Sequence, residues 1–275
     1  MAALIILAAV HAEEFDTEHL YAFHIGTDTE NPGEKEIQAS LAGGFGRNGG
    51  SYSALEGELA FQYTPVQNIL IELSAATDYH DIGNVPGIDN LNRAAFGGLG
   101  FSLTYRLVDR AAGGFGLALY AAPHWSRVDD ETGEPINGYA STFLITAEKE
   151  IVRDRLLGVV NLLYEPEIDQ SRIDEDWSRQ STAGLGGGLM LRLSANVFAG
   201  MEARYLRRYD ALDLTAFAGQ AFYLGPTISI AFNENAWLTA GWIMQVAGRA
   251  AGDNGALDLE NFDRHQARIA FGISF

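Results

Sequence analysis

The chain repeats a short run in which apolar residues alternate with polar or small ones. The clearest example is the last run, residues 264–275, where Ile269, Phe271, Ile273 and Phe275 occupy every second position. The positions between them are polar or small. Because successive side chains of a β-strand point to opposite faces, a period of two predicts a strand with one apolar and one polar face.

Twelve segments follow this period, although the run at 156–164 is apolar on both faces and its phase is ambiguous. Most have about the ten residues that a tilted strand needs to cross a bilayer. The predicted strands are residues 36–45, 55–63, 69–75, 98–107, 115–120, 142–148, 156–164, 184–193, 197–205, 224–232, 238–246 and 264–275.

The connections between these segments alternate in length. Short ones follow the second, fourth, sixth, eighth and tenth segments. The others are longer, at 78–92, 126–137, 165–180, 206–214 and 247–263, apart from the first at 46–51. Short turns on one rim and long loops on the other are typical of membrane barrels, whereas a soluble sandwich has no reason to sort its loops in this way. We therefore predict an all-β fold, a closed antiparallel transmembrane β-barrel of about 12 strands, over residues 34–275.

The final strand resembles the C-terminal signal of Gram-negative outer-membrane β-barrels. The resemblance implies that the assembly machinery reads Ile269, Phe271, Ile273 and Phe275, and that the chain resides in the bacterial outer membrane. The middle of the chain, residues 91–167, resembles a group of proteobacterial outer-membrane barrels that includes transporter-like proteins of aromatic-degradation operons. Residues 114–120 (GFGLALY) and 161–167 (NLLYEPE) carry this likeness, which implies a passive channel.

The first residues have the features of a targeting segment. Residues 2–10 are apolar, and His11-Ala12 follows as a small-residue cleavage site, although the positively charged start is missing. We predict a signal peptide at 1–12 and a periplasmic N-terminal segment at 13–33. The alternative for residues 1–12 is a buried N-terminal strand or helix, and the sequence leaves open whether the segment at 13–33 enters the lumen as a plug.

Composition excludes several classes of protein. The chain has no cysteine, which excludes a disulfide scaffold and a cysteine-bound zinc site. Its net charge of −18 argues against nucleic acid as a partner, because phosphate backbones need basic surfaces. The long connections are acidic and could bind Ca²⁺ or Mg²⁺, but none has the spacing of a calcium loop. A solvated surface is favoured, so we predict no metal and no cofactor.

The polar faces of the strands carry charges of both signs, which predicts a charged lumen. Two interpretations remain open: a polarised constriction that orients a solute, or an ion-pair network that props and fills the barrel. Closure of the barrel is expected to bring Glu36 near Arg264 and Arg268. Glycines at 98, 100, 116, 184, 186 and 188 leave space, either for a pore or for Tyr120 and arginines from across the lumen. The predicted lumen residues are Glu36, Glu56, Glu58, Glu72, Glu148, Glu202, Arg106, Arg192, Arg204, Arg264 and Arg268.

An enzyme is not predicted. Some barrels of this strand count are phospholipases with a Ser-His-Asn arrangement, and Ser126 lies near His124, but no local motif joins a serine to this histidine or to His265.

The sequence predicts a monomeric, porin-like channel for passive diffusion of small solutes. Its other partners would be membrane lipids, lipopolysaccharide and the outer-membrane assembly machinery. The alternatives are a closed structural or surface-interaction barrel with a plugged lumen, and a lipid-active hydrolase.

Overall fold

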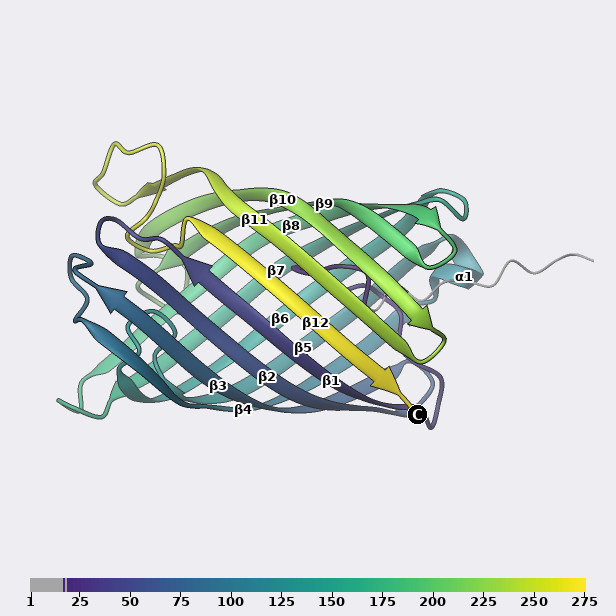
Figure 1. Cartoon of the computed structure of the whole chain (residues 1–275), viewed down its shortest axis with the longest axis horizontal. Helices are drawn as coiled ribbons and strands as arrows, with labels where there is room; N and C mark the ends of the chain where they lie inside the picture. Colours follow the sequence, from purple (N-terminus) through teal and green to yellow (C-terminus); the bar gives the residue numbers. More distant parts are fainter. Residues whose placement is uncertain (1–16, 18) are drawn as a thin grey trace, which may run out of the picture.

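The structure, a computed structural model, describes Thr17 and residues 19–275. The predicted signal peptide, residues 1–12, lies outside this part. Twelve strands form one closed antiparallel sheet in which β1 pairs with β12 (Figure 1), so the predicted barrel is confirmed. The strands are β1 Lys35–Phe45, β2 Ser51–Val66, β3 Ile69–Gly83, β4 Leu91–Val108, β5 Phe115–Val128, β6 Pro135–Val152, β7 Leu156–Ser171, β8 Trp177–Ser194, β9 Val197–Tyr209, β10 Phe217–Asn233, β11 Ala236–Ala250 and β12 His265–Ser274.

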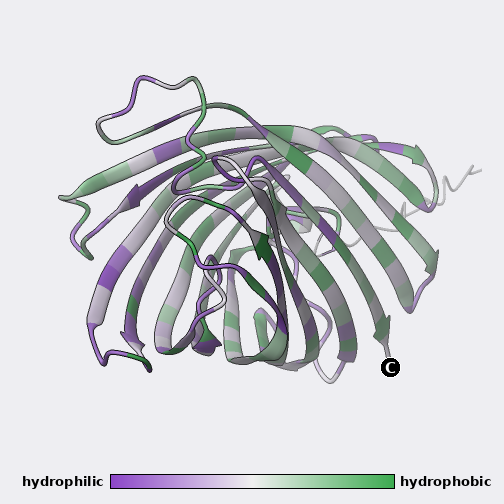
Figure 2. Cartoon of the chain, turned by 60° about the vertical axis from the view of Figure 1, so that its left-hand side comes forward, coloured by the Kyte–Doolittle hydropathy of each residue, from purple (hydrophilic) through white to green (hydrophobic). Residues whose placement is uncertain are grey.

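Apolar side chains cover the outside of the barrel. On β12, Ile269, Phe271 and Ile273 face outward, while Ala270 between them is buried. Figure 2 shows the resulting bands along the strands. Closure pairs the backbone groups of every strand, as a hydrocarbon environment requires. This architecture places the chain in the bacterial outer membrane, as predicted. Whether the assembly machinery reads the terminal residues stays a prediction.

The two ends of the barrel differ. The short connections, the C-terminus and the single-turn helix α1 (Arg110–Gly113) lie at one end (Figure 1). There the Phe275 amide donates a hydrogen bond to the Lys35 carbonyl over 2.8 Å. Within the described residues no helix is long and apolar enough to cross a membrane.

The strands extend further toward the long-loop end than predicted. The connections there shrink to residues 84–90, 129–134, 172–176, 210–216 and 251–264. Glu165, Glu167 and Asp169, which the sequence analysis placed in a loop, therefore belong to β7. The strand ends near the long loops extend beyond the bilayer into water. Because an outward-facing side chain need not be apolar there, the alternation of apolar and polar residues that predicts a strand is lost.

The N-terminal segment (residues 19–33) runs inside the barrel, in the half nearer the short turns (Figure 1). It contains no strand or helix. Sequence analysis placed it in the periplasm, and that placement is wrong for the described residues. Its polar backbone pairs with side chains from distant strands, which no local pattern in the sequence reveals.

Candidate functional site

Glu202 on β9 holds the middle of the N-terminal segment. Its fully buried carboxylate accepts hydrogen bonds from the amides of Ala22 (2.8 Å) and Phe23 (2.9 Å). The Nδ1 atom of His24 lies 2.5 Å from the same group, and the Thr227 hydroxyl also donates to it. Buried charges persist in proteins when they are paired and hydrogen-bonded in this way.

Two more lumen side chains, those of Glu148 and Asn161, bind other residues near the N-terminus. The buried carboxylate of Glu148 on β6 accepts hydrogen bonds from the Thr17 hydroxyl (2.8 Å) and the Thr27 amide (3.0 Å). The side-chain amide of Asn161 on β7 pairs with both the N–H and the C=O of Ile25, over 2.9 and 3.0 Å. These contacts satisfy buried backbone groups of the segment as strand pairing would.

Inward-facing glycines make room for the segment. A Cβ atom on Gly186 of β8 would lie 2.1 Å from Nε2 of His24, and one on Gly116 of β5 would lie 2.1 Å from Oγ1 of Thr27. The N-terminal segment therefore approaches the wall closely at both glycines and occupies space there that a side chain would need.

An apolar cluster inside the barrel completes the docking. Leu20 and Tyr21 of the segment pack against inward-facing apolar side chains of β7, β8 and β9. These wall residues are Leu157, Val159, Met190 and Phe198. The inward position of Leu157 and Val159 also resolves the ambiguous phase of the run at 156–164, because Val160 and Leu162 face outward.

Two cavities remain, one on each side of residues 22–25. The outer chamber, of about 560 Å³, lies toward the long loops, and the inner chamber, of about 230 Å³, lies toward the short turns. Both are lined by Ala22, His24, Ile25, Tyr120 and Arg268.

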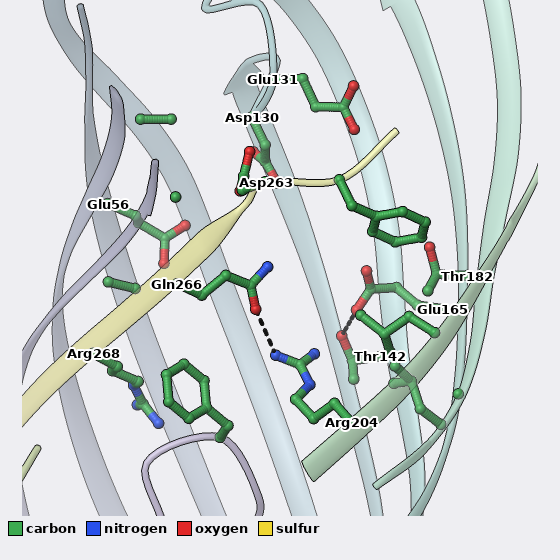
Figure 3. Close-up of a pocket in the computed structure, with 18 of the residues that line it drawn as sticks. Glu56, Asp130, Glu131, Thr142, Glu165, Thr182, Arg204, Asp263, Gln266 and Arg268 are labelled. Atoms are coloured by element: carbon green, nitrogen blue, oxygen red, sulfur yellow. Dashed lines mark hydrogen bonds between the residues drawn. The ribbon is translucent and has the colours of Figure 1, made fainter. Parts of the chain in front are cut away.

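Acidic and basic side chains both line the outer chamber (Figure 3). Its acids include Glu56 of β2, Glu165 of β7, Asp130 and Asp263, and its bases include Arg204 of β9 and Arg268 of β12. Charges of both signs along a lumen can orient a charged or dipolar solute.

The eleven predicted lumen residues divide into four groups. Those that line the two chambers are Glu56, Glu58, Glu72, Arg204 and Arg268. Those that contact the described N-terminal residues instead are Glu36, Glu148 and Glu202. Arg106 lies at the short-turn end, where it binds Asn68 over 3.0 Å and lies 3.9 Å from Asp28.

Two further arginines lie elsewhere. Arg192 donates to the carbonyls of Ser194 and Ala195 in the β8–β9 turn, and Arg264 is exposed and lines neither chamber.

The expected meeting of Glu36 with Arg264 and Arg268 does not occur. In the β1–β12 pair, Glu36 lies opposite Ser274, and Arg268 lies opposite Ala42. The pairing of these two strands was correctly expected, but their antiparallel register puts Glu36 at the short-turn end, far along the strand from Arg264.

Two arginines that sequence analysis did not select close the outer mouth, which we define as connections 129–134 and 251–264. Arg47 donates to the Asp263 carboxylate over 2.8 Å and lies 3.6 Å from Glu131. Arg208 on β9 also pairs with Glu131. Arg47 lies in a short connection with no pattern that would distinguish it, so its role depends on long-range contacts.

Acidification is expected to stabilise the closed outer mouth. Asp130 is exposed to the outer chamber, and desolvation by the surrounding protein, with the neighbouring Glu56 and Asp129 carboxylates, raises the pKa of Asp130 above its ordinary value of 3.8. The stabilisation is fully present below pH 3.8 and is lost as pH rises through the raised pKa. Amide hydrogen exchange in residues 129–134, corrected for intrinsic rates, should show more protection at acidic than at neutral pH.

Asp130→Asn should flatten this pH dependence, whereas Asp174→Asn, in the exposed connection 172–176, should leave it intact. Equal protection of wild-type residues 129–134 at both pH values would contradict the assignment.

The hydrolase alternative gains no support at His265. Its ring stacks on Trp242 with 5.4 Å between centroids, and its Nδ1 has no hydrogen-bond partner.

Several solved structures share the fold. The COG4313 outer membrane channel from Pseudomonas putida F1 is 10% identical, with a TM-score of 0.60, over 90% of this chain and 98% of that one. The translocator domain of the autotransporter NalP from Neisseria meningitidis is 14% identical, with a TM-score of 0.54, over 90% and 91%. The NanC porin is 11% identical, with a TM-score of 0.50, over 87% and 98%. At these identities the likeness shows the fold alone.

Sequence comparison is more specific about relatedness. No curated protein matches the chain. A family model does match nearly all of it, over residues 13–275, and the chain belongs to that family, the family of unknown function DUF6662.

Proposed function

We propose that the protein is an outer-membrane channel for small solutes, in which the N-terminal segment forms the narrowest part of the route. The observation that carries this proposal is the pair of chambers on the two sides of residues 22–25, which have five lining residues in common. The route would pass between the segment and the wall made by β12 and β1 to β5, beside Tyr120 and Arg268. Among the structurally similar proteins, one is described as an outer membrane channel and one as a porin, which agrees with this proposal.

The charges along this route favour cations. Glu56 lines the outer chamber, Glu58 and Glu72 line the inner one, and Arg268 borders both. Arg268 is partly engaged, because its guanidinium donates to the Ala22 carbonyl over 3.1 Å. Arg204 also lines the outer chamber, but carboxylates outnumber arginines in the lining of both chambers, and rings of acids select cations in other pores.

Withdrawal of the N-terminal segment would widen the route. The segment is not a strand of the sheet, so the barrel keeps all its strand pairing when the segment leaves. Its attachments include side-chain hydrogen bonds to Glu148, Asn161, Glu202 and Arg268 and the apolar contacts of Leu20 and Tyr21.

The second candidate is a closed structural barrel. It is favoured by the buried carboxylates of Glu148 and Glu202, both 0–1% exposed, which fix the segment across the lumen. The two candidates differ in one measurement. Folded wild-type protein in a planar bilayer should give discrete conductance steps if it is a channel, and none if the lumen stays closed.

Neutralising the inner acids is expected to weaken cation selectivity. Each carboxylate contributes about 1 kcal/mol to a cation at about 4 Å even in bulk water, so Glu58→Gln and Glu72→Gln should each lower the cation-to-anion permeability ratio roughly fivefold. The ratio follows from the reversal potential under a salt gradient. Glu234→Gln, in the exposed β10–β11 turn, is the matched control. Unchanged selectivity in both lumen variants would exclude this route.

A further inference from the structure

Three potential metal ligands meet where the N-terminal segment joins the barrel wall. His19 and Glu30 belong to the segment, and Glu36 lies at the start of β1. One ligand atom from each residue lies within 4.8 Å of the other two. His19 and Glu30 are eleven positions apart in the segment, and the fold brings both of them next to Glu36 of β1.

Glu36 is held with one oxygen directed at this point. Its carboxylate is 1% exposed, and Oε2 accepts hydrogen bonds from Trp237 Nε1 (2.8 Å) and Ser274 Oγ (2.9 Å). The other oxygen, Oε1, accepts no hydrogen bond although it is buried. It faces Nε2 of His19 across 3.4 Å. A buried carboxylate oxygen without a hydrogen bond calls for a physical explanation, and an ion is one.

The 3.4 Å spacing fits two ligands of one metal ion. It exceeds the range of about 2.7–3.2 Å for N–H···O hydrogen bonds. Zinc lies about 2.0–2.1 Å from histidine nitrogen and about 2.0–2.2 Å from carboxylate oxygen, and at a tetrahedral angle of about 109° two such atoms are about 3.4 Å apart.

The surroundings also orient the ligands. The Trp237 ring stacks on the His19 ring, with 3.9 Å between centroids and 9° between planes. The same indole donates a hydrogen bond to Oε2 of Glu36, the oxygen that faces away from His19. Metal sites depend on such neighbours to fix the direction of each ligand.

We infer that His19, Glu30 and Glu36 form a binding site for a divalent transition-metal ion of the Zn²⁺ class. One imidazole nitrogen and two carboxylate oxygens are ligands that Zn²⁺ accepts, and a fourth position is left for water. The ion joins the segment to β1 and so holds the segment in the lumen. The site is a property of the folded barrel, and it stands whether or not the protein conducts. Sequence analysis predicted no metal, because these ligands have no recognisable spacing along the chain.

The test is Zn²⁺ binding by the full chain, freed of any polyhistidine tag and stripped with a chelator. Isothermal titration should show one equivalent bound with micromolar or tighter affinity. His19→Gln and Glu30→Gln should each weaken binding by about 100-fold or more, since even the loss of an outer-shell partner costs about 10- to 100-fold. His124→Gln, which alters a histidine on β5 away from the site, should leave binding unchanged.

Two further measurements use wild-type protein and do not depend on channel activity, so they test the site even if the variants fail to fold. Co²⁺ should give the absorption bands of a tetrahedral site with wild-type protein, and crystals soaked in Zn²⁺ should give an anomalous peak beside His19. Absence of stoichiometric binding by folded wild type, or equal binding by His19→Gln, would reduce the cluster to a His–Glu ion pair and overturn the inference.

Discussion

Gly186→Val is expected to raise single-channel conductance several-fold by expelling the N-terminal segment. A Cβ atom at this position would lie 2.1 Å from Nε2 of His24. His24 has no room to retreat, because it is 5% exposed and its other nitrogen is 2.5 Å from the Glu202 carboxylate. Valine itself suits a strand, so β8 should persist while the segment leaves. Planar-bilayer recording measures the change.

The matched control is Gly57→Val on β2. A Cβ atom there meets nothing closer than the Thr77 carbonyl at 3.8 Å, so its conductance should match wild type. Chymotrypsin supplies an independent readout, because Tyr21 is 3% exposed in the docked segment. Cleavage at this residue should be slow in wild type and in the control but rapid in Gly186→Val. Rapid cleavage without increased conductance would contradict the proposed role of the segment as the constriction.

A disulfide between positions 22 and 241 is expected to abolish the widest conductance state. A Cβ atom on Gly241 of β11 would lie 2.5 Å from Cβ of Ala22. Disulfides need about 3.5–4.5 Å between Cβ atoms, so the segment must move back by about 1–2 Å, which an irregular backbone permits. Because the chain has no cysteine, Ala22→Cys combined with Gly241→Cys forms a single defined bond. Adding reductant should restore the lost state within the same recording.

The two single-cysteine variants are the controls, since neither can form the bond and neither should respond to reductant. A locked protein that conducts like its reduced form would mean that solutes pass beside a stationary segment. The route along β12 and β1 to β5 would then be supported, while the proposed gating role of the segment would be contradicted. Silence in both the locked and reduced forms of folded protein would favour the closed structural barrel.

Two features of the sequence are consistent with a lumen that is partly filled by protein. Leu157 and Val159 are apolar on a lumen face, where a water-filled barrel would have polar residues. The glycine at 186 likewise marked a place where something approaches the wall closely. Sequence analysis left the phase of the run at 156–164 ambiguous and allowed the space beside the glycines to hold either a pore or Tyr120 and arginines, so neither feature identified the N-terminal segment as the occupant.

The barrel itself was determined by the sequence alone. The period of two sets the faces of each strand, and the sorting of short and long connections sets the closed antiparallel order. Both are local properties, because alternation needs only neighbouring residues and a turn needs only a few. That is why β12 and its outward-facing Ile269, Phe271 and Ile273 could be read correctly from the chain.

The contents of the barrel were decided only by the tertiary structure. The segment is bound by Glu148 and Glu202, which lie 121 residues from Thr27 and 180 residues from Ala22 along the chain. The register of the β1–β12 pair places Glu36 opposite Ser274 and not opposite an arginine. A charged residue on a lumen face is equally compatible with lining a route, anchoring a segment or capping a turn. Which of these occurs depends on partners that only closure of the barrel brings within reach.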